Sequence, residues 1–304
     1  MQSKKSKKTG SERRKHENHV RGGARPPASG KPGRGQNTPH RSPQKGRAEP
    51  AGALRAGANS YLLWGQHAVE AALHNPHRRI KQIYITSESA QRLAEITDAL
   101  PADRASQLPA PQMADKARFD KLTSDGGKAL HQQLVLDVAP LEPLDLTDYL
   151  YQDGPLRCLV LDQVTDPRNI GAMLRSARAF GVSALVMTRR HAPDEGGVLA
   201  RAAAGALEDV PIIQVTNLAR ALEAMDEAGL HIAGLEASGT TSLESLASQP
   251  RLALIMGSEG DGMRRLTREA CHSLASIDMA DNSESLNVSV AAAIALYASR
   301  LQSA

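Results

Sequence analysis

Three short polar segments in the second half of the chain carry residue types that can do chemistry. They span residues 169–175, 257–260 and 285–289, and each follows an apolar run typical of a buried strand. In an open α/β sheet, ligands bind beyond the carboxyl ends of the strands. The order of the segments therefore predicts one shared site that presents an Asn, an Arg, a Glu, a Ser and a second Asn.

Taken singly, the first and third segments have simpler structural interpretations. Asn169 and Ser285 could each cap a helix, with Asn287 in the first turn of the last one. Arg175 and Arg178 lie three residues apart, so they could be solvated helix residues or could bind a phosphate together. From these residues alone, both interpretations stay open.

The middle segment is a glycine-rich turn, residues 257–262. Its glycines could form a flexible loop, or could let backbone groups approach a ligand closely. Glu259, held among these glycines, could accept a proton or a hydroxyl hydrogen bond. His67 and His131 are each isolated, and we interpret them as structural.

Several common site motifs are missing from the sequence. There is no GxGxxG after the first strand of the βα region and no GxxxxGK[ST], which argues against the usual dinucleotide and P-loop sites. There is also no GxSxG elbow and no His/Cys cluster with zinc spacing. The predicted sheet must therefore bind its ligand in another way.

The elements that position these segments alternate between strand and helix from residue 157 on. A parallel sheet covered by helices on both faces explains this alternation. The expected strands are residues 158–161, 184–187, 211–215, 231–235 and 252–256, and the expected helices are residues 169–180, a helix from Asn217, and residues 286–301.

A smaller α/β unit precedes this region. Alternating apolar residues predict strands at 80–85 and 134–138, with helices within 64–73 and at 89–100. Proline, glycine and acidic residues then indicate a linker. The predicted domains are residues 59–139 and 157–304, with residues 140–156 as the linker and residues 1–58 as a separate tail.

Residues 1–58 form a strongly basic tail, with 15 Lys and Arg against 3 Asp and Glu and no Phe, Tyr or Trp. The rest of the chain holds 22 basic and 30 acidic residues, so the net charge of +4 hides a basic tail on an acidic body. Such a tail cannot bury enough apolar surface to fold, and we expect disorder. It either solubilises the protein or binds RNA phosphates, and given the rest of the chain we favour RNA.

The cysteines and the apolar runs limit the location of the protein. Cys158 and Cys271 give neither a disulfide framework nor metal-binding spacing, so we expect a reducing compartment and no bound metal. No apolar run approaches the roughly 18 residues that span a bilayer. The N-terminus has no apolar secretory stretch, and it is not amphipathic like a transit peptide. We therefore expect a cytoplasmic protein that does not bind membranes.

Taken together, the three segments resemble the SPOUT superfamily of S-adenosylmethionine-dependent RNA methyltransferases, and within it the TrmH-type ribose 2′-O-methyltransferases. The likeness spans residues 157–301 and is most specific in residues 161–171 and 263–269. Residues 73–85 resemble the small substrate-binding domain of the family more weakly.

This resemblance implies a fold that no composition could indicate, a parallel sheet with a deep trefoil knot. It implies a homodimer whose interface completes each active site. It also implies methyl transfer from S-adenosylmethionine to a ribose 2′-hydroxyl in RNA, most closely in a guanosine of 23S rRNA. The alternatives are the same chemistry on tRNA, and a non-catalytic RNA-binding ribosome-assembly factor with this fold.

The resemblance further implies the roles of single residues. The catalytic positions of the family match Asn169, Arg175, Glu259, Ser285 and Asn287, and the positions whose backbone holds the adenosine match Gly257, Ile277 and Leu286. Asp278 and Asp281 replace a usual Pro and a usual Gly, so we expect an altered cofactor loop, and Gln133 replaces a usual Gly.

Arg175 is a poor base, because the pKa of a guanidinium exceeds about 12. We therefore assign it to the substrate phosphate and to stabilising the developing alkoxide. Glu259 and the two asparagines orient the hydroxyl or pass its proton on.

Overall fold

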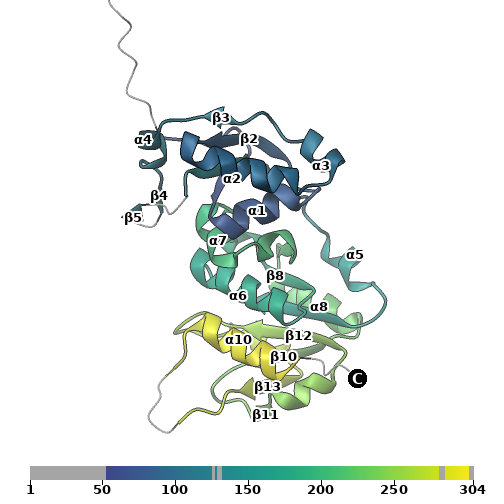
Figure 1. Ribbon diagram of the computed structural model, residues 1–304. Helices are drawn as coiled ribbons and strands as arrows, with labels where there is room; N and C mark the ends of the chain where they lie inside the picture. The colour runs from purple at the N-terminus through teal and green to yellow at the C-terminus, as the bar shows by residue number, and fades with distance from the viewer. Residues whose placement is uncertain (1–52, 125–126, 129–131, 281–284, 301–304) are drawn as a thin grey trace, which may run out of the picture. The chain divides into compact units, whose positions relative to one another are not determined.

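The computed structural model describes residues 53–124, 127–128, 132–280 and 285–300 (Figure 1). Three sequence predictions lie outside these ranges. They are the disorder of the basic tail as far as residue 52, the structural role of His131 and the effect of Asp281.

The larger sheet has seven parallel strands in the order β11-β13-β10-β12-β7-β8-β9. This confirms the predicted α/β class with a parallel sheet. The strands are β7 (Leu156–Leu161), β8 (Ala184–Thr188), β9 (Ile212–Val215), β10 (His231–Leu235), β11 (Thr241–Ser242), β12 (Arg251–Met256) and β13 (Ser273–Ser276).

Helices cover both faces of this sheet. Successive strand residues point to opposite sides, so each strand contributes side chains to two cores. Leu159 and Leu161 of β7 pack in one core with α6 (Pro167–Ala179), α7 (Gly197–Ala203) and α10 (Val288–Ala298). Cys158 and Val160 of the same strand pack in a second core with α5 (Leu146–Leu150) and α8 (Leu218–Glu227). The remaining elements are α9 (Arg265–Glu269) and the 3-10 helices η1 (Arg189–His191), η2 (Ala206–Glu208) and η3 (Glu244–Ser248).

A smaller sheet has the strand order β1-β6-β2-β3. Strand β6 runs antiparallel to both β1 and β2, and β3 runs parallel to β2. These elements are β1 (Tyr61–Trp64), α1 (Gln66–His74), β2 (Ile80–Ile85), α2 (Ser87–Asp98), α3 (Ala102–Ser106), β3 (Gln112–Met113), α4 (Lys116–Phe119) and β6 (Leu134–Val138), with a hairpin of β4 (Thr123–Ser124) and β5 (Gly127–Lys128).

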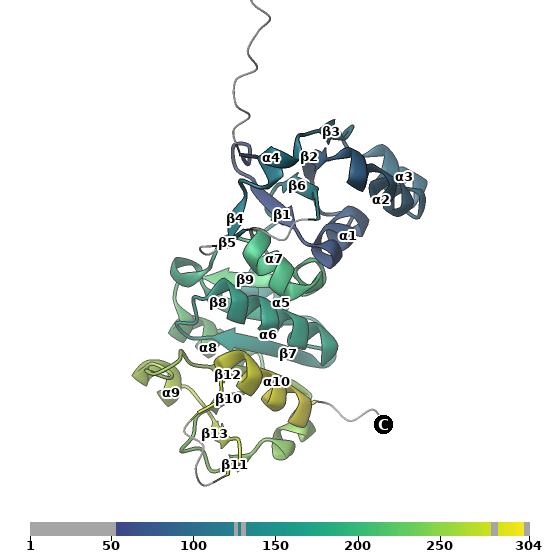
Figure 2. The same ribbon diagram turned by 60° about the vertical axis from the view of Figure 1, so that its left-hand side comes forward.

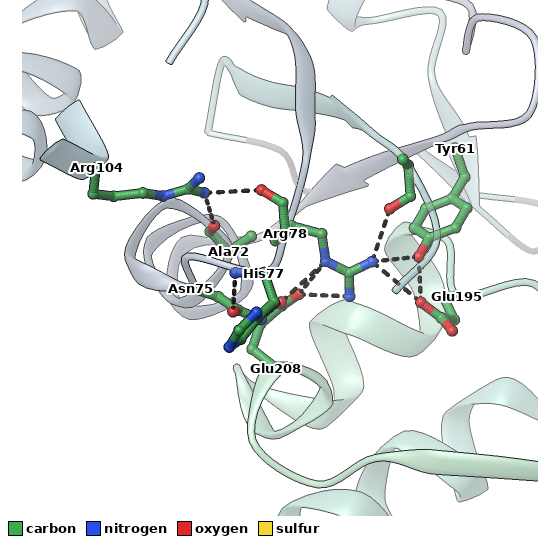
Figure 3. Close-up of polar contacts among 9 residues, drawn as sticks. Tyr61, Ala72, Asn75, His77, Arg78, Arg104, Glu195 and Glu208 are labelled. Carbon is green, nitrogen blue, oxygen red and sulfur yellow. Dashed lines mark hydrogen bonds and ion pairs between the residues drawn. The ribbon is translucent and has the colours of Figure 1, made fainter. Parts of the chain in front are cut away.

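The smaller sheet is joined to the larger one through β1 and α1, which contact α7 and η2 (Figures 1 and 2). Arg78 is buried at this junction and binds both sides (Figure 3). Its Nε donates to the carboxylate of Glu208 over 3.0 and 3.1 Å, and its Nη1 donates to the Tyr61 hydroxyl over 2.6 Å and to Glu195 over 3.2 Å. Burial alone would lower the pKa of Arg78, but hydrogen bonding and the charge of Glu208 raise it, so the guanidinium stays charged.

Several helices begin at other residues than predicted, among them α2, which starts at Ser87 instead of Ser89. Helix α6 starts at Pro167 rather than at Asn169, because Asp166 caps it by accepting from the Arg168 N–H over 2.8 Å. Helix α10 starts at Val288, and its cap is Asn287 rather than Ser285. The sequence analysis also predicted none of the strands β1, β3, β4, β5, β11 and β13, which have only two to four residues each.

Candidate active site

The carboxyl ends of three neighbouring strands meet at one edge of the larger sheet. Leu161 ends β7 and pairs with Met256, the last residue of β12, which in turn pairs with Leu235, the last residue of β10. The loop into α6, the glycine-rich turn and the Glu236 segment all start at this edge. It is the place where a parallel sheet binds its ligands.

Three predicted site residues form a hydrogen-bonded cluster there. Asn287 Nδ2 donates to Glu259 Oε1 over 2.9 Å and to Asn169 Oδ1 over 3.2 Å. Asn169 Nδ2 donates to the same Glu259 oxygen over 3.5 Å, and the Val288 N–H does so over 3.3 Å. The fold thus joins side chains that lie 90 and 118 positions apart in the chain.

Asn287 holds this cluster in a fixed orientation. Its Oδ1 caps α10 by accepting from the N–H of Ser289 over 2.9 Å and from the Ser289 hydroxyl over 2.6 Å. Because the amide oxygen is used by these donors, the amide nitrogen faces Glu259 and Asn169. The other carboxylate oxygen of Glu259, Oε2, receives no hydrogen bond from the part of the chain that the structure describes. It is therefore available to accept one from a substrate hydroxyl.

The glycine-rich turn is closed by its own backbone. Ser258 and Gly262 exchange two N–H to carbonyl hydrogen bonds of 3.1 Å each. Gly260 and Gly262 have φ angles of +91° and +66°, which residues other than Gly rarely adopt. A Cβ at Gly257 would lie 2.3 Å from the carbonyl carbon of Gly262, so the close return of the chain requires Gly at this position.

A cavity of about 700 Å³ lies against this turn. The three predicted cofactor-binding residues, Gly257, Ile277 and Leu286, all line it, together with Glu259 and Asn287 of the cluster. Its walls combine apolar side chains, turn backbone and the carboxylate of Glu236. This combination and size suit a nucleoside with one charged end, so the residues present fit S-adenosylmethionine.

An ion pair fixes the turn to the neighbouring strand. Asp162 directly follows β7 and is completely buried, and its two carboxylate oxygens accept from Arg264, one from the backbone N–H over 2.9 Å and one from Nε over 2.7 Å. Arg264 lies just beyond Gly262, so this pair ties the end of the turn to the first residue of the α6 loop. The sequence predicted no role for either residue, although both lie next to the motif segments.

Glu236 is a further cavity residue that the sequence did not indicate. It follows β10, and its carboxylate accepts from Arg268 Nε over 2.8 Å and from the Ser238 hydroxyl over 2.5 Å. These two hydrogen bonds, that of Arg268 first, lower the pKa of Glu236. An ionised carboxylate at this wall can accept hydrogen bonds from the hydroxyls of a bound ribose.

Other predicted residues lie at the site without joining the cluster. Ser285 lines the cavity and is exposed, and it has no recorded hydrogen bond to the three cluster residues. Arg175 is exposed on α6, without an ion pair or hydrogen bond in the described ranges. Arg178 instead pairs with Asp209 over 2.8 Å. Asp278 is exposed beside the half-buried Ile277. The exposed His67 on α1 is outside the cluster.

Comparison with known families matches both parts of the chain. The model of the SpoU rRNA Methylase family matches residues 157–297, and a model described as RNA 2′-O ribose methyltransferase substrate binding matches residues 62–144. A 23S rRNA (guanosine-2′-O-)-methyltransferase, RlmB of Escherichia coli strain K12, is 39% identical over 242 residues, 78% of this chain and 97% of that protein.

The chain belongs to the SpoU rRNA methylase family. The enzyme of this name from Vibrio cholerae is also 39% identical and covers 78% of this chain, with 94% of its own length matched. The crystal structure of the SpoU methyltransferase AviRb from Streptomyces viridochromogenes has the same fold, with a TM-score of 0.64 at 22% identity over 80% of this chain and 89% of that one. Family membership confirms the predicted enzyme class, an RNA ribose 2′-O-methyltransferase that uses S-adenosylmethionine.

Among the described residues of this SpoU protein, no helix is long and apolar enough to cross a membrane. Within the same ranges, no three His, Cys, Asp or Glu side chains are grouped so that they could hold a metal ion.

Proposed function

We propose that this protein methylates the ribose 2′-hydroxyl of a guanosine in 23S rRNA. The observation that carries the proposal is the shared location of two features. Glu259 and Asn287 of the polar cluster line the same cavity as Gly257, Ile277 and Leu286. A methyl donor in the cavity and a hydroxyl at the cluster are therefore neighbours. The relatives from Escherichia coli and Vibrio cholerae, which match over nearly their whole length, support 23S rRNA as the substrate.

The residues of this chain prepare the acceptor hydroxyl, which is a weak acid. S-adenosylmethionine supplies an electrophilic methyl group on a positively charged sulfur. Glu259 Oε2 accepts the hydroxyl proton while the oxygen–carbon bond forms and the carbon–sulfur bond breaks. Asn169 and Asn287 hold the carboxylate through Oε1, so that Oε2 keeps one position. The second N–H of the Asn169 amide also adds a donor beside the oxygen that develops negative charge.

Arg175 holds the RNA backbone in this proposal. It lies six residues after Asn169 on α6, about 9 Å along the helix axis. A planar guanidinium binds a phosphate through two parallel hydrogen bonds. Since Arg178 is engaged with Asp209, Arg175 is the one of these two arginines that is left to bind the phosphate. Arg175→Lys keeps the charge but loses the planar fork, and we expect turnover to fall at least about tenfold.

Each part of the chain has its own role in the proposed reaction. Residues 59–139 form the RNA substrate-binding domain, residues 140–156 the linker and residues 157–304 the methyltransferase domain, whose final segment passes through a loop as a trefoil knot. The basic tail, residues 1–58, adds contacts to RNA phosphates. A protein that modifies ribosomal RNA works where ribosomes assemble, in the cytoplasm.

A homodimer is part of the proposal, and one face of α10 supports it. Val290, Ile294 and Tyr297 are spaced four and three residues apart, so they share one side of the helix, and they are 46%, 38% and 54% exposed. Such an apolar stripe on the last helix of a domain needs a partner surface. Ile294→Lys should convert a dimer to a monomer in sedimentation velocity, whereas a monomeric wild type would contradict this part of the proposal.

The direct test is a map of 2′-O-methyl groups in 23S rRNA and tRNA from a strain that lacks the gene. We expect the loss of one guanosine methyl in 23S rRNA, restored by the wild-type gene. Ser285→Ala tests the remaining predicted catalytic residue in the same strain. An unchanged map in both RNAs would exclude a methyltransferase function, and a missing methyl in tRNA alone would exclude the 23S substrate.

A further inference from the structure

A second cleft, of about 370 Å³, lies between β1 and the loop that follows β8. Its walls are largely aromatic rings and prolines, from Tyr61, Trp64, Pro167 and Pro193. Asp194 also lines it and is exposed. Flat apolar walls with one carboxylate are typical of a site for a planar heterocycle that carries hydrogen-bond donors.

The cleft is next to the polar cluster. Pro167 is the first residue of α6, and Asn169 of the cluster lies two residues later in the same turn, about 3 Å along the helix axis. A base in the cleft and a ribose hydroxyl at Asn169 are therefore close enough to belong to one nucleotide. RNA-binding proteins commonly read single-stranded bases by stacking them on aromatic rings and binding their edges.

Two polar groups of the cleft have no partner of their own. The indole Nε1 of Trp64 has no hydrogen-bond acceptor among the residues that the structure describes, although the side chain is 92% buried. Asp194 has no ion pair in the same ranges. The edge of guanine presents two adjacent donors, N1–H and the 2-amino group, which one carboxylate can bind together. Adenine lacks both donors.

On these grounds, and resting on the proposed function, we propose that this cleft holds the guanine base of the methylated nucleotide. Asp194 accepts from N1–H and the 2-amino group, and Trp64 and Pro167 contact the ring. Arg189 and Arg190, both exposed in the same loop, supply positive charge for the adjoining phosphates. The cleft is thus the specificity site of the enzyme, separate from the cofactor cavity.

The walls of the cleft are held in place before RNA binds. The Tyr61 hydroxyl donates to Glu195, the residue after Asp194, and both contact the buried Arg78 (Figure 3). On the other side, Gly197 lies so close to the Trp64 ring that an added Cβ would be 2.1 Å from it. This packing fixes the Trp64 ring before RNA binds.

The sole tryptophan of the chain makes occupancy of the cleft measurable. The probe is the RNA fragment that carries the mapped methylation site, used with the full-length protein. We expect this fragment to quench Trp64 fluorescence, and the same fragment with an abasic ribose at the target to bind, by anisotropy of a labelled end, without that quenching. Equal quenching by both RNAs would overturn the proposal.

A kinetic test addresses Asp194 itself. Inosine lacks the 2-amino group, so wild-type kcat/KM should be at least about fivefold higher for a guanosine target than for an inosine target. Asp194→Asn should bring this ratio close to one while leaving the affinity for S-adenosylmethionine unchanged. Glu223→Gln, an exposed substitution on α8 across the sheet, is the matched control and should keep the wild-type ratio.

The outcomes separate the two proposals. A wild-type protein that methylates the fragment, with a guanosine-to-inosine ratio that Asp194→Asn does not change, would overturn the base site and leave the proposed function intact. A wild-type protein that methylates no RNA would overturn both.

Discussion

The buried carboxylate of Asp162 should contribute both to the stability of the protein and to its affinity for the cofactor. Its two hydrogen bonds from Arg264 are the link between the glycine-rich turn and the β7 strand. Asp162→Asn keeps the size of the side chain, but leaves one oxygen to accept where there were two. The variant therefore loses one of the two hydrogen bonds, and the other no longer has an ionised acceptor.

The expected size of the effect follows from this geometry. A hydrogen bond to a charged group contributes about 1.5–3 kcal/mol. Arg264 is 43% exposed on its side chain, so water can solvate it once the carboxylate is gone, and the loss stays near the lower limit. We expect the free energy of unfolding to fall by about 2 kcal/mol. For a domain of this size, that is a decrease in Tm of about 4–8 °C.

Calorimetry measures both consequences. Differential scanning calorimetry should show the decrease in Tm, and titration with S-adenosylmethionine should show weaker binding, because the turn lines the cofactor cavity. Arg265→Gln is the control, since Arg265 and Glu269 form an exposed i,i+4 pair that contributes less than about 0.5 kcal/mol. If Asp162→Asn melted and bound like the control variant, the link between Asp162 and the turn would carry no stability, and the reasoning would fail.

Three further predictions concern single residues. Gly257→Ala should abolish cofactor binding in calorimetry, because its methyl group would collide with the backbone of the returning turn. Arg268→Gln removes the first cause of the lowered pKa of Glu236, so in urea unfolding the variant should be less stable than wild type at pH 7, and the difference should vanish at acidic pH, below the ordinary range of a glutamate, where Glu236 of the folded protein becomes protonated. Burial raises the pKa of Cys158 to about 12 and of Cys271 to about 11, so neither thiol should react with a disulfide reagent at pH 8 until the protein unfolds.

Each of these predictions has a contrary result. Wild-type cofactor affinity in Gly257→Ala would show that the turn can open. A stability difference in Arg268→Gln that persisted at acidic pH would assign the effect to packing instead of charge. Rapid reaction of a thiol in the native protein would show that its strand or helix end opens to solvent.

The sequence predicted the elements whose residues repeat regularly. The β2 and β6 strands begin and end where the apolar pattern does, and the strands of the larger sheet follow their apolar runs within one or two residues. The first residue of each helix was harder to predict, because several residues near it can act as the N-cap. Asp166 and Asn287 cap the two helices, in place of Asn169 and Ser285, because the side chain of each accepts from the backbone N–H two residues later.

The candidate site was predictable only where residues belong to a motif. Asn169, Glu259 and Asn287 meet as expected, but nothing in the sequence indicates that Asn287 has its amide fixed by Ser289. Glu236 follows a strand without a recognised motif, and Asp162 lies in a family-specific stretch but had no assigned role, so only the register of β10, β12 and β7 brings them to the same edge of the sheet. The cleft at Trp64 depends on the contact between two sheets, which no local pattern contains.

The most direct test of the central claim is methyl transfer by Glu259→Gln. Tritium transfer from labelled S-adenosylmethionine to the unmodified 23S rRNA should occur with wild type. It should fall by two orders of magnitude or more with the variant, roughly the contribution of a general base. The amide can still accept through one oxygen, so the cofactor should bind with near wild-type affinity. Turnover close to that of wild type, with the cofactor bound, would contradict the assignment of Glu259 as the proton acceptor.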